Sequence, residues 1–290
     1  IVAASGVVIG DGSRQVEVTL NSVEAMGNVD IVLGSQSSLS VGEINTAIGS
    51  VDITLGSGST LAVDELHSAV GSVLMDGGGA AIDVKNISAG TQVEITNAGS
   101  VSVGSVTAVK VDIEAFADVT VDSFTATGGS SSIVSESGRV FLTDVFVNGV
   151  FSAYSGGGNL SIAGGGEIYA QKGVNLVSEN WILVDDHAVI SAGRGSDVVL
   201  RAEMINLSNA QVGNTDKTNT VMWTGDLNAF GDNAIYAGGI EFDSDAYINV
   251  SDYSSLFFYT GQRGIELTGD ASHSTGEVVF DVNNITVADT

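Results

Sequence analysis

The sequence predicts an all-β protein, a right-handed parallel β-helix (β-solenoid) with roughly a dozen coils of 18–25 residues. Three observations predict it: a tandem repeat, an alternation of apolar and polar residues inside each repeat, and many glycines without any proline. VDIVLGSQSSLSVGEINTAIGS (29–50) is followed directly by VDITLGSGSTLAVDELHSAVGS (51–72), and these two blocks align without a gap and match at 13 positions. Units this short cannot bury a core alone, but stacked copies can.

The alternation predicts strands whose apolar side chains form columns inside the coils. Val-x-Ile-x-Leu occurs at 29–33 and again at 51–55, with the two-residue period of a strand. The blocks 93–110 and 111–128 align on a shorter period of 18, which keeps the strands and shortens the turns. Right-handed coiling is the usual preference of parallel crossover connections. Interior columns are expected at Val29, Ile31, Leu33, Val51, Ile53, Leu55, Val93, Ile95, Val111 and Ile113.

Glycine and proline usage fits a stack of tightly turned coils. The chain has 38 glycines and no proline, and 43% of its residues are hydrophobic although only 6% are aromatic. Glycine supplies corners with a positive φ, whereas proline would remove a hydrogen-bond donor from strands that pair on both sides. The expected corner glycines are Gly34, Gly49, Gly56 and Gly71.

The repeat runs along the chain without a Gly/Ser-rich or charged linker, so we expect a single solenoid domain over residues 1–290. Residues 1–28 already follow the repeat, and its register loosens after Ser72. The segment 214–238 matches the repeat poorly and is expected to form an irregular excursion, after which regular strands return at 239–261.

Composition argues against two classes of partner. The 35 acidic residues outnumber nine basic ones and give a net charge of −26, which disfavours nucleic acids and anionic membranes. The acidity is explained by solubility or by binding of calcium or other counter-ions. There is no cysteine for a disulfide or a thiolate metal site. No apolar run approaches the length of a membrane span, and the first residues do not read as an intact signal peptide.

Two acidic pairs are weak candidates for a calcium site: Asp185 with Asp186, and Asp243 with Asp245. Calcium prefers several oxygen ligands, and such pairs at turns supply some of them. The tandem Gly-Gly-x-Gly-x-Asp of nonapeptide calcium repeats is missing. Solvated turn carboxylates are the simpler interpretation, and no other cofactor is expected.

No catalytic residues are expected. His187 follows Asp185 and Asp186, and such a pair supports acid–base chemistry only where a nucleophile faces it. His67 and His273 are isolated in the sequence. A glycosidase needs two carboxylates across a groove, and many pairs would satisfy that spacing. Aromatic residues at 236–259 either stack on sugar rings or pack among strands and turns.

The strand phrases between 150 and 213 carry a resemblance to a known family. GNLSI, GEIYA, GVNLVS, AVISAG, SDVVLRA and MINLSNAQV follow one another as short alternating units. This pattern resembles the filamentous-haemagglutinin-type repeats of large secreted bacterial adhesins. The resemblance implies a right-handed parallel β-helix, an extracellular location and an adhesive or matrix role. The chain departs from that family in having no N-terminal secretion domain with an Asn-Pro motif, and no proline at all.

These observations favour an extracellular structural or adhesive β-solenoid, namely a segment or self-stacking subunit of a bacterial surface adhesin, filament or biofilm matrix fibre. Neither end of the sequence offers a helix or polar cap, so the expected partners are a second copy stacked end to end or flanking solenoid repeats. Extracellular polysaccharide and a host or cell surface are further expected partners. Two alternatives stay open: a carbohydrate-binding or polysaccharide-cleaving β-helix, and a calcium-dependent surface-layer protein.

Overall fold

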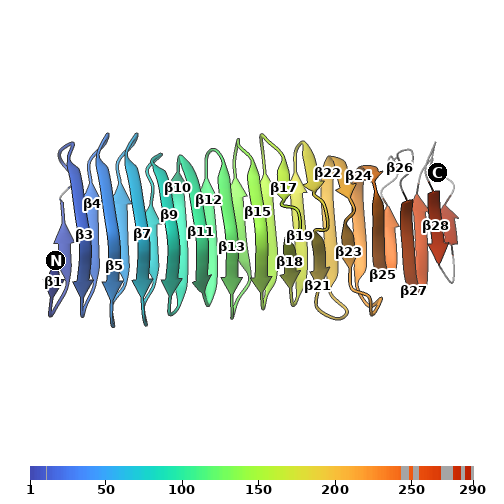
Figure 1. Ribbon diagram of the computed structural model, residues 1–290, viewed down its shortest axis with the longest axis horizontal. Coiled ribbons are helices and arrows are strands. Elements are labelled where there is room, and N and C mark those ends of the chain that lie inside the picture. Colours follow the sequence, from blue (N-terminus) through green and yellow to red (C-terminus); the bar gives the residue numbers. More distant parts are fainter. Residues whose placement is uncertain (11, 243–247, 251–254, 269–276, 282–284, 289–290) are drawn as a thin grey trace. The chain divides into compact units, whose positions relative to one another are not determined.

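The protein is an all-β parallel β-solenoid of about 11 turns in the computed structural model (Figure 1). The structure describes residues 1–10, 12–242, 248–250, 255–268, 277–281 and 285–288. Over these residues there is no helix, and hence none that is long and apolar enough to cross a membrane. The chain divides into two compact units, Ile1–Gly138 (unit 1) and Arg139–Thr290 (unit 2). The single domain over 1–290 and the right-handed coiling stay predictions.

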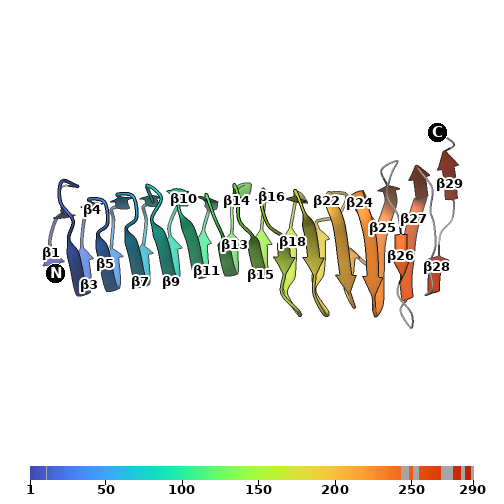
Figure 2. The same cartoon turned by 90° about the horizontal axis from the view of Figure 1, so that it is seen from above.

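Unit 1 alternates short and long strands, and each strand pairs in parallel with its equivalent in the next coil. Figures 1 and 2 show the long strands β3 to β13 beside one another in chain order. After β1 (Val2–Ala3) and β2 (Val7–Ile9), the long strands are β3 (Glu17–Ala25), β5 (Ser38–Thr46), β7 (Thr60–Ser68), β9 (Ala81–Ala89), β11 (Ser100–Ala108) and β13 (Val119–Ala126). The short strands are β4 (Val29–Leu33), β6 (Val51–Leu55), β8 (Val73–Asp76), β10 (Gln92–Ala98), β12 (Lys110–Ala115) and β14 (Ser131–Ser135).

Each long strand of unit 1 bends once, so a coil has three straight segments. In β5 the buried side chains are Leu39 and Val41 before the bend and Ile44 and Thr46 after it, so the regular alternation is interrupted by one extra residue. The ladder to β7 skips Gly42, which lies at the bend. A residue left out of the ladder turns the strand, and the following side chains still point into the core.

The interior of unit 1 consists of aligned apolar columns. Val29 pairs with Val51, Ile31 with Ile53 and Leu33 with Leu55. The first column continues without a break through Val73 to Val93 and Val111, although the later coils are shorter. All ten positions expected in the interior have exposed fractions of 2% or less. Because apolar burial is the main driving force for folding, these columns hold the coils together.

The four expected corner glycines lie at corners, but not for the expected reason. None has a positive φ; a side chain is excluded by the close approach of the neighbouring coil. A Cβ on Gly49 would lie 2.3 Å from the carbonyl carbon of Gly27, and one on Gly71 would lie 2.3 Å from the carbonyl oxygen of Gly49. The positive φ angles of these two coils occur just after the corner glycines Gly34 and Gly56, at Gln36 and Gly58.

Unit 2 has shorter strands that merge into longer ones toward its end. Its first strands are β15 (Val140–Val147), β16 (Val150–Ser155), β17 (Leu160–Ile162), β18 (Glu167–Ala170), β19 (Gly173–Ser178), β20 (Trp181–Val184) and β21 (Val189–Ala192). The later ones are β22 (Asp197–Ser208), β23 (Gln211–Gly213), β24 (Thr220–Phe230), β25 (Asp232–Phe242), β26 (Ile248–Val250), β27 (Ser255–Thr268), β28 (Glu277–Asp281) and β29 (Ile285–Ala288).

The segment 214–238, expected as an irregular excursion, is mostly regular strand. Residues 214–219 form a turn, and the rest, apart from a bend at Gly231, lies in β24 and β25, which pair with β22 and β23. A buried asparagine anchors the short turn to the previous coil. The side-chain amide of Asn219 donates to the carbonyl oxygens of Gly193 and Ser196, both at 2.8 Å, so a polar residue typical of a loop satisfies the previous coil's backbone.

Candidate functional site

The outward side chains of the short strands β4 to β12 form an acidic face on unit 1. Successive coils place carboxylates in register on this face, as in the pairing of Asp30 with Asp52. Lys110 is the basic residue among them. The carboxylates of the acidic face are Asp30, Asp52, Asp76, Glu94, Asp112 and Glu114.

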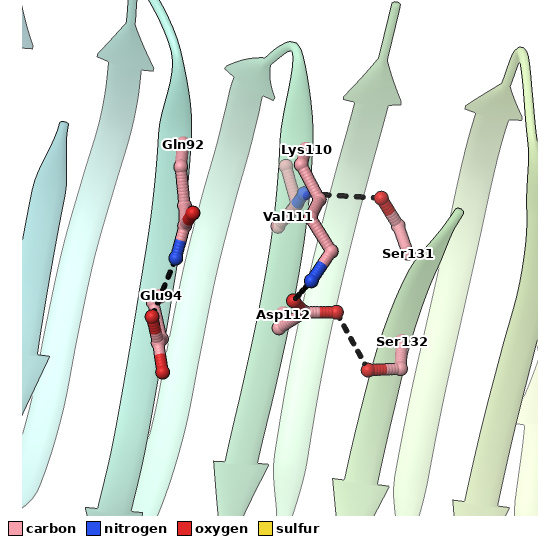
Figure 3. A network of polar contacts seen from close by, with 7 residues as sticks. All are labelled: Gln92, Glu94, Lys110, Val111, Asp112, Ser131 and Ser132. Atoms are coloured by element: carbon pink, nitrogen blue, oxygen red, sulfur yellow. Dashed lines mark hydrogen bonds and ion pairs between the residues drawn. The ribbon is translucent and has the colours of Figure 1, made fainter. Parts of the chain in front are cut away.

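At the β10–β14 end, neighbouring side chains already satisfy the acidic face (Figure 3). Lys110 Nζ forms an ion pair with Asp112, and Ser132 Oγ donates to Asp112 Oδ1 at 2.8 Å. Gln92 Nε2 donates to Glu94 Oε2 at 2.5 Å. The hydrogen bond to Asp112, and then its charge, raise the pKa of Lys110. At this end Glu94 and Asp112 are therefore already bound by neighbouring side chains, whereas Glu114 is exposed.

At the β4–β6 end, Asp30 and Asp52 face each other without a cation. The pKa of Asp52 is raised, and burial is the largest cause. The charge of Asp30 and a hydrogen bond that only the protonated carboxyl can donate to Asp30 raise it further. Asp52 Oδ1 is buried without a hydrogen-bond partner. Because its pKa is raised on folding, the contribution of Asp52 to stability is full in acid and is lost as the pH rises through the raised pKa.

We expect Asp52→Asn to stabilise the protein at neutral pH, because an amide carries no charge to bury or to repel Asp30. The gain should shrink as the pH falls through the raised pKa and disappear once the carboxyl is protonated in both folded and unfolded states. Urea unfolding between about pH 2.5 and pH 8, which extends below the ordinary pKa of an aspartate, measures it. Asp122→Asn, which removes the same charge from an exposed side chain on β13, is the control. A variant less stable than the parent at neutral pH would contradict this assignment.

A shallow depression of about 290 Å³ lies on the acidic face beside Asp52, Asp76 and Glu94. Three carboxylates near one depression resemble a cation site. However, the described residues contain no group of three or more His, Asp or Glu side chains placed to hold a metal ion. The depression is therefore not assigned to a metal.

A second polar surface lies after the bend of the long strands and is here called the furrow. It is an open depression of about 650 Å³ across β5, β7, β9 and β11. Two rows of outward side chains line it, and each row keeps its register from strand to strand. The first row is Glu43, Glu65, Asn86 and Ser105, and the second row is Asn45, His67, Ser88 and Thr107.

The furrow has a flat floor and polar walls. Leu66 and Ile87 point away from it into the core, so the floor is backbone that is already hydrogen-bonded in the ladder. Neighbouring strands lie ~4.8 Å apart and alternate residues ~7 Å apart, so the rows run in parallel for about 14 Å. His67, which the sequence left isolated, lies here between Asn45 and Ser88.

Comparisons with known protein families, with curated proteins and with solved structures find no match to this chain. The fold is a β-solenoid, but the resemblance to filamentous-haemagglutinin-type repeats has no family assignment behind it.

Asp185 and Asp186 lie in an exposed turn of unit 2 between β20 and β21. Asn209 Nδ2 donates to Asp186 Oδ1 at 2.6 Å, and His187 Nδ1 lies 2.9 Å from Asp186 Oδ2. The hydrogen bonds from Asn209 and then from His187 lower the pKa of Asp186. Asn209 and His187 thus hold the carboxylate of Asp186 in place at a corner of the solenoid. Asp243 and Asp245, the other weak metal candidates, lie outside the described residues, as does His273.

This turn belongs to a corner column that the sequence analysis missed. Gly165, His187, Asn209 and Gly231 are evenly spaced along the chain, one coil apart, and their φ angles are 74°, 63°, 47° and 72°. Glycine and asparagine adopt the left-handed conformation most readily, and histidine is also enriched there. His187 therefore occupies a structural corner. The signal that would have found it is the fixed spacing of Gly, His and Asn.

The aromatic residues of β25 and β27 pack on one another. The rings of Tyr236 and Tyr259 stack with centroids 4.8 Å apart and an interplanar angle of 10°. Phe257 stacks on Tyr259 at 6.0 Å, and Lys217 Nζ lies 5.4 Å from the centroid of the Tyr259 ring. Sugar stacking needs an accessible ring face. The ring faces that meet each other or Lys217 are therefore not open to a sugar; Tyr247 and Tyr253, in the same predicted stretch, lie outside the described residues.

Proposed function

We propose that the protein is a secreted structural and adhesive β-solenoid on the bacterial cell surface. It would serve as a segment or self-stacking subunit of an adhesin, filament or biofilm matrix fibre. The observation that carries the proposal is the coil-to-coil register of unit 1, in which equivalent residues of successive coils pair directly. Val29 with Val51 and Leu39 with Leu61 are examples. This regularity gives unit 1 a continuous ladder from coil to coil, which suits a load-bearing or space-spanning element.

The mechanism is mechanical. Separating two neighbouring coils of unit 1 breaks the hydrogen bonds of all three segments at once and exposes the apolar columns. Proteases cut chains in locally opened segments, and strands bonded on both sides open rarely. The net charge of −26 favours solubility and keeps copies apart until cations or a ligand bridge them. A second copy, flanking repeats, extracellular polysaccharide or a cell surface are the partners proposed.

The two alternatives differ in their support. A calcium-dependent surface layer is not proposed, because the described residues offer no group of side chains suited to a metal ion. Carbohydrate binding has a specific observation in its favour, the furrow on β5–β11 with its two rows of polar side chains. It is compatible with an adhesive role, and no enzyme activity is proposed.

Digestion of the full chain with proteinase K tests the structural role. We expect unit 1 to survive while an unfolded control protein is degraded, with the cut sites identified by mass spectrometry. Rapid cleavage inside β4–β13 would overturn the proposal. Electron microscopy of the same sample, with and without calcium, then distinguishes the two forms of the proposal. Filaments indicate a self-stacking subunit, and discrete particles indicate a segment of a longer fibre.

A further inference from the structure

The furrow on β5–β11 carries hydrogen-bonding groups that the protein itself leaves largely unused. Asn86 Nδ2 donates to Glu65 Oε1 at 2.7 Å. Within the part of the chain that the structure describes, the other six side chains of the furrow form no hydrogen bond or ion pair with another side chain. On the acidic face, by contrast, Lys110 and Ser132 satisfy Asp112. The furrow is therefore available for a polar ligand.

The chemistry of the rows points to a ligand with many hydroxyl groups. Amides and hydroxyls both donate and accept, imidazole does so when neutral, and carboxylates accept only. These groups recur at every strand, at intervals of ~4.8 Å, which suits a chain of repeated hydroxylated units. An extended peptide binds a sheet by adding a strand to a free edge. That mode is closed here, because the ladders on both sides of β7 and β9 already use the backbone of the floor.

Charge narrows the ligand class further. Glu43 and Glu65 occupy directly paired positions on β5 and β7, where like charges repel each other. No lysine or arginine lines the furrow. Lys85 at the bend pairs with Asp64 at 2.5 Å and interacts only more weakly with the charge of Glu65. An acidic sugar would therefore meet two carboxylates whose nearest lysine is already paired. An amine placed between Glu43 and Glu65 would form charge-assisted hydrogen bonds and relieve the repulsion.

We propose that the furrow binds an oligosaccharide that carries free amino groups, with an amine at the Glu43–Glu65 pair. Its hydroxyls lie along the neutral half of the furrow, over Asn86, Ser88 and Thr107. The two ends of the furrow differ in charge, so the ligand binds in a preferred direction. The inference goes beyond the structural role and does not depend on it, since binding is measurable on the purified chain in either case.

The test is calorimetric titration of the full chain in about 0.15 M salt, which screens attraction to distant charges. The probes are a hexamer of β-1,4-linked glucosamine, its fully N-acetylated counterpart and a hexamer of galacturonic acid. We expect the glucosamine hexamer to bind at least about tenfold more tightly than the N-acetylated one. No binding of the acidic hexamer is expected. Equal affinity for the first two, or binding of the third, contradicts the proposal.

Matched variants distinguish binding in the furrow from general electrostatic attraction to an acidic protein. Glu43→Gln/Glu65→Gln should reduce the preference for glucosamine over N-acetylglucosamine to near unity. Glu114→Gln/Glu136→Gln removes the same charge from exposed side chains outside the furrow and should leave that preference intact. Equal losses in both double variants would mean non-specific attraction to a chain of charge −26 and would overturn the proposal.

A blocking variant tests the position of the ligand. Ser88 lies half-buried and outward in the second row, so Ser88→Trp fills the furrow while the strand keeps a residue that β-sheets accept. We expect it to weaken binding of both glucosamine hexamers at least about tenfold. Its circular dichroism spectrum and unfolding transition report whether the fold is intact. An intact Ser88→Trp variant with full affinity would exclude the furrow, and the structural role would still stand on its own test.

Discussion

Replacing Gly49 by alanine is expected to destabilise unit 1 by about 3 kcal/mol. A Cβ at this corner would lie 2.3 Å from the carbonyl carbon and 2.4 Å from the next backbone nitrogen of the preceding coil, at Gly27 and Asn28. Neither atom can yield, because Val29 N donates to the Ser50 carbonyl oxygen at 2.9 Å and holds the two coils at their spacing. Relief requires the coils to separate locally, which opens the ladder. Urea unfolding followed by circular dichroism measures the loss, and hydrogen exchange of β4–β7 localises it.

Gly129→Ala is the matched control for this prediction. Gly129 also lies at a corner of unit 1, between β13 and β14, and its φ is not positive. The nearest atoms to a Cβ there belong to the Lys110 side chain, at 3.8 and 3.9 Å, which is ordinary contact. We expect a change within about 0.5 kcal/mol. If both variants lose the same stability, the tight approach of the coils at Gly49 does not limit the fold.

The solenoid and its interior columns could be predicted because they follow directly from the sequence repeat. When similar phrases recur at a fixed spacing, equivalent side chains must have equivalent environments, and the alternation within a strand says which are buried. The shorter coil between Val93 and Val111 did not affect the prediction of the column, because turns absorb changes in length while the column keeps its register. The position of the corner glycines was equally clear. The reason why glycine is required there was not clear, because a sequence pattern does not show the distance to the neighbouring coil.

Some features could not be predicted because they depend on contacts between coils. Serine reads as a turn or surface residue, yet Ser37 and Ser59 are buried inside the corners of unit 1. Ser59 Oγ accepts from Ser37 N and donates to the Gly34 carbonyl oxygen, both at 3.0 Å. Asn219 in unit 2 has the same role for its turn. Burial of these polar groups is tolerated only because each finds a partner one coil away.

The furrow was missed for a related reason. Its rows are assembled from the alternating pairs Glu-x-Asn, Glu-x-His, Asn-x-Ser and Ser-x-Thr, each unremarkable in one strand. His67 looked isolated because its neighbours Asn45 and Ser88 each lie a full coil away along the chain. Once the coil length is known, stacking the sequence at that length recovers both rows. A repeat therefore needs to be read across its copies for surface chemistry as well as for the core.

Replacing Phe124 by alanine is expected to cost about 3–5 kcal/mol, the other large effect on unit 1. Phe124 is 1% exposed and pairs with Val106 in the column that holds Ile44, Leu66 and Ile87 in earlier coils. Removing the ring leaves a cavity that ladders on both sides of the column prevent from closing. Phe116→Ala, in the neighbouring turn, removes the same ring from a side chain that is 46% exposed and should cost far less. Urea unfolding of both variants measures the difference. Because the chemistry of the two substitutions is identical, equal losses would show that the columns are not a close-packed core, and the proposed stiffness of the solenoid would lose its physical basis.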